Sequence, residues 1–299
     1  TVSANDCFRP VSRYFDRISR PEHLLSALPR ALRTMTDPAD CGPVTLAFCQ
    51  DVQTEAWDYP EEFFEPRVWH IRRPAPDAGE LARVADLIRA AQRPVIVSGG
   101  GTIFSGAEET LAEFATRHAI PVTETQAGKS GLAQAHPMNL GAAGVDGSAA
   151  ANAALREADL VIGVGTRLQD FTTGSRTLFA PQARLVSINV QGFDAAKHGA
   201  APLVGDAKVT LEVLGATLGG YTAGGVDAGA RADWLRAVDA YCARPDDQDA
   251  LPTDGQVIGA VQRAARPDTV VMCAAGTMPG ALKLLWQPGQ GGYHMEYGF

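Results

Sequence analysis

Three glycine-rich or polar strand ends are the parts of this sequence best suited to hold a ligand. They are Gly99, Gly100 and Gly101 after the run PVIVS, residues 163–167 ending in Arg167, and Asn189 closing the run LVSIN. Ligands of open parallel sheets bind beyond the carboxyl ends of the strands, so these segments could form a nucleotide site. A dinucleotide fingerprint needs G-x-G-x-x-G, and Phe104 stands at its third glycine. We therefore favour tight strand-to-helix corners, which leaves at most a vestigial nucleotide site.

A second segment, CAAGTMPG at 273–280, offers a different kind of anion site. An apolar strand ends there in Ala-Gly-Thr, just before a helical pattern. Free N–H groups at such a helix start suit a diphosphate. Turns of this kind occur in any α/β protein, so the segment indicates a phosphate-bearing ligand only together with other features.

The remaining polar candidates have simpler explanations. Lys129 lies between glycines and could contact an anion, but the GKS here lacks the upstream glycine of a P-loop. We expect His136 to be a hydrogen-bonded turn residue, and the other histidines lack metal-ligand spacing. Glu61 and Glu62 are expected on a solvated face. No G-x-S-x-G elbow or other recognisable pair of nucleophile and base occurs in the sequence.

Composition excludes several classes of protein. The 299 residues carry a formal net charge of −8 without a Lys/Arg block, so nucleic acid is not an expected partner. No apolar run reaches the roughly 18 residues of a membrane span, so no membrane is expected either. The five cysteines are scattered and lack C-x-x-C spacing. We expect reduced, mostly buried thiols in a cytoplasmic protein.

Short apolar strands alternate with helical patterns through much of the chain, which predicts an α/β fold with a parallel sheet covered on both faces. Strands are expected within GPVTLAF, PVIVS, IPVTE, DLVIGVGTRL, ARLVSINV and DTVVMCAAG. The predicted organisation is a partial domain at 1–60, a linker at 61–78, a central Rossmann-like domain at 79–218, a Gly/Ala-rich linker at 219–232 and a second partial domain at 233–299. Both ends are expected to be cut, because the chain opens without Met and stops on an aromatic residue.

These motifs, taken in order, resemble the thiamine-diphosphate enzymes of the acetolactate-synthase type. FRPVSRYFDRISRPEHLLSALPRALR and GPVTLAFCQDVQ are similar to the end of that family's pyrimidine-binding domain. PVIVSGGG, GKSGLAQAHPMNLGAAG, ADLVIGVGTRLQDFTTG, LVSINV and PLVGDAKVTLEVL are similar to its central domain. AAGTMPGALKLLW and YHMEYGF are similar to the start of its diphosphate-binding domain. VSRYFDRI, QDVQTEAWDYPEEFF, AAGTMPG and YHMEYGF most resemble the inositol-catabolism branch, the trihydroxycyclohexane-1,2-dione acylhydrolases.

The resemblance implies hydrolytic C–C cleavage, with thiamine diphosphate as electron sink and Mg²⁺ as its anchor. It also implies a homodimer or homotetramer, because the family's sites form between two chains. Two short segments correspond to cofactor-contacting loops: Gly276, Thr277 and Met278 at the diphosphate, and Glu296, Tyr297 and Gly298 at the aminopyrimidine.

Other family features are missing from the sequence. The activating Glu and the GDG…N motif have no match, so we expect no catalytic residue in this chain, no metal ligand, and weak cofactor binding by the chain alone. Asn189 replaces the Asp usual in FAD-binding members, so FAD is not expected. Three alternatives stay open: an acetolactate-synthase-like carboligase or decarboxylase, a malonic semialdehyde oxidative decarboxylase, and a stand-alone nucleotide-binding module.

Overall fold

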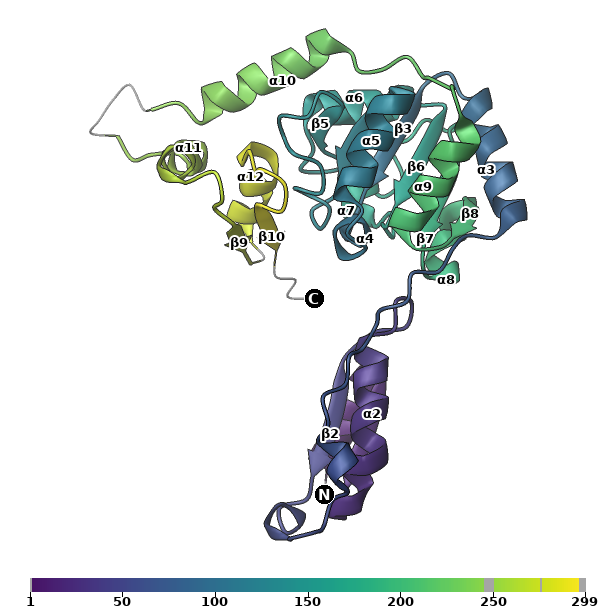
Figure 1. Cartoon of the computed structure of the whole chain (residues 1–299). Coiled ribbons are helices and arrows are strands. Elements are labelled where there is room, and N and C mark those ends of the chain that lie inside the picture. Colours follow the sequence, from purple (N-terminus) through teal and green to yellow (C-terminus); the bar gives the residue numbers. More distant parts are fainter. Residues whose placement is uncertain (1, 245–249, 275, 296–299) are drawn as a thin grey trace. The chain divides into compact units, whose positions relative to one another are not determined.

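The chain divides into two compact units, residues 1–73 and 74–299. The structure is a computed structural model that describes residues 2–244, 250–274 and 276–295 (Figure 1).

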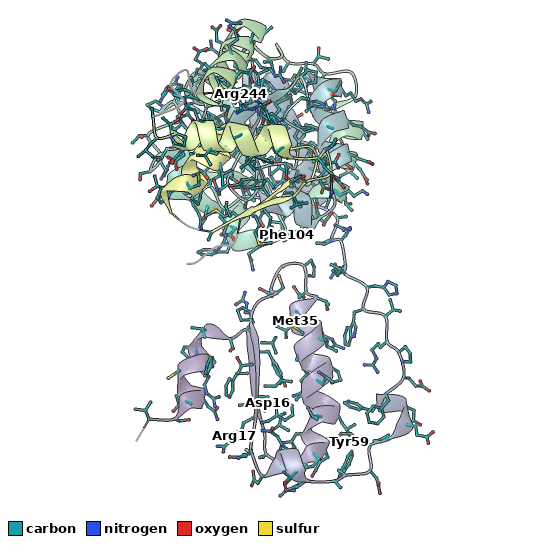
Figure 2. The ribbon with its side chains drawn as sticks, turned by 90° about the vertical axis from the view of Figure 1, so that its left-hand side faces the viewer. Asp16, Arg17, Met35, Tyr59, Phe104 and Arg244 are labelled. Carbon is teal, nitrogen blue, oxygen red and sulfur yellow. The ribbon has the colours of Figure 1, made fainter. Side chains whose placement is uncertain are left out.

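The first unit is built on two parallel strands and one long helix. Strand β1 (Tyr14–Ile18) pairs with β2 (Val44–Phe48), and α2 (Leu24–Met35) packs against both. Figure 2 shows α2 alongside the strand that carries Asp16 and Arg17. The shorter elements are α1 (Ala4–Phe8), η1 (Arg9–Val11), η2 (Pro21–His23), η3 (Val52–Thr54) and η4 (Glu61–Phe63). Because a two-stranded sheet buries little apolar surface, the core is small: Ile18, Ala27 and Val52.

The second unit contains a six-stranded parallel sheet in the order β5-β4-β3-β6-β7-β8. Its strands are β3 (Pro94–Ser98), β4 (Val122–Glu124), β5 (Asn139–Ala142), β6 (Leu160–Val164), β7 (Arg184–Asn189) and β8 (Ala201–Val204). The strand order reverses between the neighbours β3 and β6, which makes this a doubly wound sheet. The expected α/β class with a Rossmann-like parallel sheet is confirmed.

Helices cover both faces of the sheet. On one face α3 (Ala78–Ala90), α5 (Glu108–His118) and α9 (Ala207–Leu218) enclose a core that includes Ile96 and Ile162. On the other face α6 (Ala149–Glu157) covers Val95, Val97 and Val161. Successive strand residues point to opposite faces, so PVIVS fills both cores, which explains its unbroken apolar character. Short helical segments complete the sheet domain: α4 (Gly100–Phe104), α7 (Asp170–Thr173), α8 (Gly192–Ala195) and η5 (Lys197–Gly199).

The C-terminal elements pack beside the β5 edge of the same unit. They are α10 (Ala228–Tyr241), α11 (Asp254–Ala264), β9 (Val271–Cys273), α12 (Thr277–Leu285) and β10 (Tyr293–Met295). Strands β9 and β10 form a two-stranded parallel sheet. Trp234, Trp286 and Tyr293 share one buried cluster with Leu140 of β5. The residues after 232 therefore share a core with the edge of the central sheet.

The sequence patterns did not predict four of the described strands, which are β1, β5, β8 and β10. Strand β5 illustrates the reason, because its sequence NLGA contains no β-branched residue and lies within a glycine-rich stretch. It is a strand because β4 pairs with it and α6 packs on it. Helix α11 begins with a capping box, in which Thr253 and Gln256 exchange side-chain to backbone hydrogen bonds.

The prediction of mostly buried cysteines is wrong. Cys7 and Cys41 are exposed, and Cys49, Cys242 and Cys273 are partly exposed; all are free thiols. These cysteines lie in the first unit and in the C-terminal elements. Each of these parts contains only a two-stranded sheet among its described residues, which buries fewer side chains than the six-stranded sheet does. Within the described ranges, none of the helices has both the length and the apolar character needed to cross a bilayer.

At Gly141 in β5, the indole of Trp234 from α10 lies directly against the backbone of the sheet. The φ of Gly141 is +83°, and a Cβ added there would lie 2.8 Å from Cη2 of Trp234. We predict that Gly141→Ala lowers the free energy of unfolding by on the order of 3 kcal/mol, from the strained backbone and the displaced indole. Urea unfolding followed by far-UV circular dichroism measures this. Gly219→Ala is the control, with φ +61° and open space around the added methyl; equal losses in the two variants would contradict the steric role of Trp234.

Candidate functional site

The glycine turn after β3 is a close crossing of two backbones. Gly99 N donates to Val164 O at 2.8 Å, and Gly101 N donates to Gly165 O at 2.9 Å. A Cβ on Gly101 would lie 2.6 Å from Gly165 Cα, and a Cβ on Gly100 would lie 3.1 Å from Ala127 Cβ. The turns after β3 and β6 therefore touch, which requires glycine, and two of the N–H groups that could bind a phosphate are used within the protein.

The other members of the predicted nucleotide site lie at the same edge of the sheet. Asn189 Nδ2 donates to Thr166 O at 3.3 Å, and its Oδ1 accepts from Gln191 N at 3.0 Å. Arg167 is exposed. The structure thus brings the predicted residues to one edge, but the Asn189 side chain closes its own turn and joins it to the turn after β6.

One strand away, the turn after β4 contains a buried ion pair. Lys129 Nζ lies 3.2 Å from Glu124 Oε1, and the two side chains are 1% and 2% exposed. Within the described part of the chain, Glu124 Oε2 has no hydrogen-bond partner. The expectation that Lys129 could contact an anion is wrong, because its ammonium group is shielded from solvent and paired with a carboxylate.

The same turn holds Tyr293, the first residue of β10, which is 4% exposed. Gln126 Nε2 donates to the Tyr293 hydroxyl at 2.6 Å. The Ser130 hydroxyl accepts from Tyr293 N at 3.2 Å and donates to Tyr293 O at 3.3 Å. The Tyr293 ring centroid lies 5.7 Å from Lys129 Nζ, and the Tyr293 hydroxyl lies 3.2 Å from Cys273 Sγ in β9. Side chains and backbone of one turn therefore fix both strands of the small C-terminal sheet.

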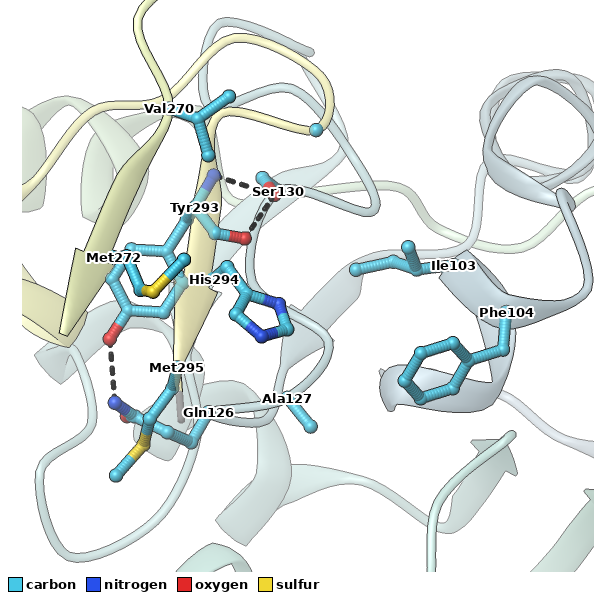
Figure 3. Close-up of a pocket in the computed structure, with 11 residues that line it drawn as sticks. Ile103, Phe104, Gln126, Ala127, Ser130, Val270, Met272, Tyr293, His294 and Met295 are labelled. Carbon is cyan, nitrogen blue, oxygen red and sulfur yellow. Dashed lines mark hydrogen bonds between the residues drawn. The ribbon is translucent and has the colours of Figure 1, made fainter. Parts of the chain in front are cut away.

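A cavity of about 330 Å³ opens between this turn, α4 and the β9–β10 sheet (Figure 3). Ile103, Phe104 and Ala127 line it from the central domain, and Met272 and His294 line it from the C-terminal strands. Its walls are mainly apolar, and Phe104 is 83% exposed. The polar groups nearest the C-terminal strands, Gln126 and Ser130, already bind Tyr293, as the dashed lines in Figure 3 show.

The start of α12 is the described segment best suited to phosphate oxygens. Gly276 precedes the helix with φ +140° and ψ −169°, a conformation essentially restricted to glycine. Among the described residues no side chain caps this helix start, and Gly276 and Thr277 are exposed. The first N–H groups of a helix lack intrahelical acceptors and favour anions. The geometry here fits a diphosphate, whereas Glu296, Tyr297 and Gly298 lie outside the described residues.

A buried lysine anchors α12 to the central domain. Lys283 is 4% exposed, and its Nζ donates to Ala143 O at 2.8 Å. Burial lowers the pKa of Lys283 to about 8, although Asp146 and Glu124 favour its charged form. A lone lysine in the apolar run ALKLLW could have signalled a buried anchor. The roles of Gln126, Ser130 and Tyr293 carry no such signal, because their partners are far away in the sequence.

The histidine predictions can also be assessed. His136 Nε2 lies 3.2 Å from Thr116 Oγ1, and its Nδ1 accepts from Met138 N at 3.2 Å, so it is a hydrogen-bonded turn residue as expected. Burial and the nearby Arg231 lower the pKa of His136. Glu61 and Glu62 are exposed, as expected. In the ranges that the structure describes, no three or more His, Cys, Asp or Glu side chains gather as a metal site.

Comparison with known proteins gives two findings. Residues 81–214 match the family model described as the thiamine pyrophosphate enzyme central domain. The whole chain is also similar to proteins named 3D-(3,5/4)-trihydroxycyclohexane-1,2-dione hydrolase. It is 41% identical over 323 aligned positions to that of Geobacillus thermodenitrificans and 43% identical over 325 positions to that of Halalkalibacterium halodurans. The alignments cover 100% of this chain but 50% and 51% of those relatives. The chain thus spans about half the length of the curated relatives it matches.

The buried ion pair leads to a first prediction for this site. Lys129→Met leaves the Glu124 carboxylate buried without its cation, so we expect the free energy of unfolding to fall by about 3–5 kcal/mol. The double variant Lys129→Met/Glu124→Gln removes the stranded charge and should recover part of this loss. Urea unfolding of the two variants tests the pair, and a double variant no more stable than the single one would contradict it.

The pKa of Lys283 leads to a second prediction. Its folded-state pKa of about 8 lies below the ordinary 10.5, so the unfolded chain binds the proton more tightly. Stability should therefore rise with pH between about 8 and 10.5 and be lost as pH falls through that window, by about 3 kcal/mol in total. Lys283→Met should flatten this rise relative to the parent in unfolding measured at several pH values. Lys208→Met on the partly exposed surface of α9 is the control and should keep the parent's slope.

Proposed function

We propose that the whole protein is a thiamine-diphosphate-dependent hydrolase that opens trihydroxycyclohexane-1,2-dione in inositol catabolism. The match of residues 81–214 to the thiamine pyrophosphate enzyme central domain supports the cofactor. One observation carries the proposal: similarity to the named hydrolases extends over all 299 residues, through the segments on both sides of the central domain. Mg²⁺, a homodimer or homotetramer and a cytoplasmic location belong to the same proposal.

In this proposal the chain binds and orients the cofactor. When bound, thiamine diphosphate would supply the nucleophilic carbon and the electron sink that cleavage of a C–C bond next to a carbonyl requires. The exposed start of α12 provides N–H groups for the diphosphate at Gly276, Thr277 and Met278, and Glu296, Tyr297 and Gly298 are proposed to face the aminopyrimidine. Lys283 and Tyr293 hold α12 and β10 against the central sheet. No catalytic residue is assigned to this chain.

The central domain has a supporting role in this proposal, and we infer no FAD there. Gly99 N donates to Val164 O at the end of β6 and Gly101 N donates to Gly165 O in the next turn, while the Asn189 side chain bonds to Thr166 and Gln191. These internal hydrogen bonds favour corners of the fold over an active nucleotide site at Gly99, Gly100, Gly101, Arg167 and Asn189.

Product analysis tests the reaction. With thiamine diphosphate, Mg²⁺ and the cyclic dione, the whole protein should yield an open-chain acid with the mass of the substrate plus one water. In H₂¹⁸O one heavy oxygen should appear in the new carboxyl group. A parallel assay with pyruvate separates the carboligase alternative, and pyruvate consumption without dione turnover would contradict the proposal.

Gly276 provides a test of the cofactor site itself. Gly276→Ala forces a side chain onto φ +140° and should redirect the first turn of α12. We expect the Kd of thiamine diphosphate for the whole protein to rise roughly tenfold, a loss of about 1.4 kcal/mol. Isothermal titration calorimetry measures it. Gly199→Ala, with φ +72° and open space around the added methyl, is the matched control; an unchanged Kd in Gly276→Ala would remove Gly276 from the site.

A further inference from the structure

Tyr293 is hydrogen-bonded through its backbone and through its side chain to the turn after β4. Its backbone N and O both bond to one Ser130 hydroxyl, and its own hydroxyl accepts from Gln126. Gln126 and Ser130 lie 167 and 163 residues away in the sequence. Figure 3 shows the two contacts on opposite ends of the tyrosine, one at its backbone and one at its ring hydroxyl. The residue is thus fixed along its whole length by the turn after β4.

The turn that holds Tyr293 is itself rigid. Lys129, between Gln126 and Ser130, is paired with Glu124 in the interior. Ser130 has φ +72°, a left-handed conformation that a serine adopts only when its surroundings impose it. Ser130 O also accepts from Gly291 N at 3.1 Å, and Gln134 N donates to Pro288 O at 3.3 Å. The contact between this turn and the segment before β10 is therefore continuous and made of specific hydrogen bonds.

Tyr293 also connects the two strands of the small sheet. It is the first residue of β10 and pairs with Val271 in β9, and its hydroxyl lies next to Cys273 at the end of β9. In the chain, β9 leads to Gly276 and Thr277, and β10 leads directly to Glu296. Both proposed cofactor-contacting segments therefore begin within a few residues of groups that Tyr293 touches.

We propose that Tyr293 is a positioning residue: the turn at 126–130 of the central domain fixes it, so that β9 and β10, the strands that precede the proposed cofactor-contacting segments in the chain, stay paired at that turn. This inference rests on the proposed function, since it assigns those segments to thiamine diphosphate. Tyr293 itself does not touch the cofactor in this account. It acts through the strands that it joins.

Tyr293→Phe tests the inference, because it removes only the hydroxyl and keeps the ring and the backbone bonds to Ser130. Gln126→Leu removes the same hydrogen bond from the central domain. Tyr221→Phe is the matched control: its hydroxyl donates to Ala91 O at 3.3 Å in the same unit, away from β9 and β10. All variants are made in the whole protein, with two measurements on each: backbone hydrogen exchange and the Kd of thiamine diphosphate from the quenching of tryptophan fluorescence.

We expect the amides of β9 and β10 to exchange about tenfold faster in Tyr293→Phe and Gln126→Leu, as loss of one buried hydrogen bond predicts, with the amides of β3 and β6 unchanged. The Kd should rise about tenfold in both and stay at the parent value in Tyr221→Phe. The double variant should bind the cofactor no more weakly than Tyr293→Phe alone, because Tyr293→Phe already removes the hydrogen bond that Gln126→Leu removes.

Two results would overturn the inference. Exchange in β9 and β10 that matches the parent would show that the hydroxyl does not fix the strands. Faster exchange with an unchanged Kd would show that the strands do not position cofactor-contacting residues. A parent protein that binds no thiamine diphosphate is a separate result, which contradicts the proposed function and with it the role assigned to these strands.

Discussion

The buried ion pair between Lys129 and Glu124 is the constraint on which the placement of the C-terminal strands β9 and β10 depends. Two charges can remain in an apolar interior only at close range, because each alone loses the solvation that water gave it. The pair therefore ties the turn after β4 to the strand itself. Gln126 and Ser130 flank Lys129 in that turn, and they determine where Tyr293 lies. The ion pair within this turn therefore helps to position Tyr293, which lies more than 160 residues later in the chain.

The same side of the sheet receives further anchors. Lys283 binds Ala143 O just after β5, and Arg231 donates to Asn139 O within β5. Trp234 fits against Gly141, where there is no space for a side chain. Strand β5 is an edge strand, and an exposed edge offers unpaired backbone groups that promote aggregation. The C-terminal helices protect this edge with specific contacts, which explains why the segment after residue 232 shares a core with the sheet although it follows a Gly/Ala-rich stretch.

The sequence allowed the sheet class, the buried strands PVIVS and LVIGV and the helices around them to be predicted, because burial on both faces demands continuous apolar runs. The tight corner at Gly99 was predictable as well, since the missing third glycine argued against a fingerprint. Strand β5 was not predictable from its own residues, as only pairing with β4 makes NLGA a strand. The burial of the Lys129–Glu124 pair and the contacts of Tyr293 were not predictable from the sequence either, because they depend on residues far apart in the chain. Glycine around Lys129 indicates exposure by composition, whereas the side chain is buried against Glu124 of β4 and near the ring of Tyr293, which is distant in sequence.

The turns at the carboxyl ends of neighbouring strands in this sheet have different contacts. The turns after β3 and β6 bond to each other, whereas the turn after β4 bonds to the C-terminal strands. The turns after β3 and β6 lie so close that Gly99 N donates to Val164 O at the end of β6 and Gly101 N donates to Gly165 O in the turn. At β4 the turn directs its polar side chains outward to a different part of the chain. The usual ligand-binding edge of a doubly wound sheet has thus become a surface for internal docking. In the proposed function, the turn after β4 supports the cofactor site indirectly, because its hydrogen bonds to Tyr293 hold the strands that lead to the proposed cofactor-contacting residues.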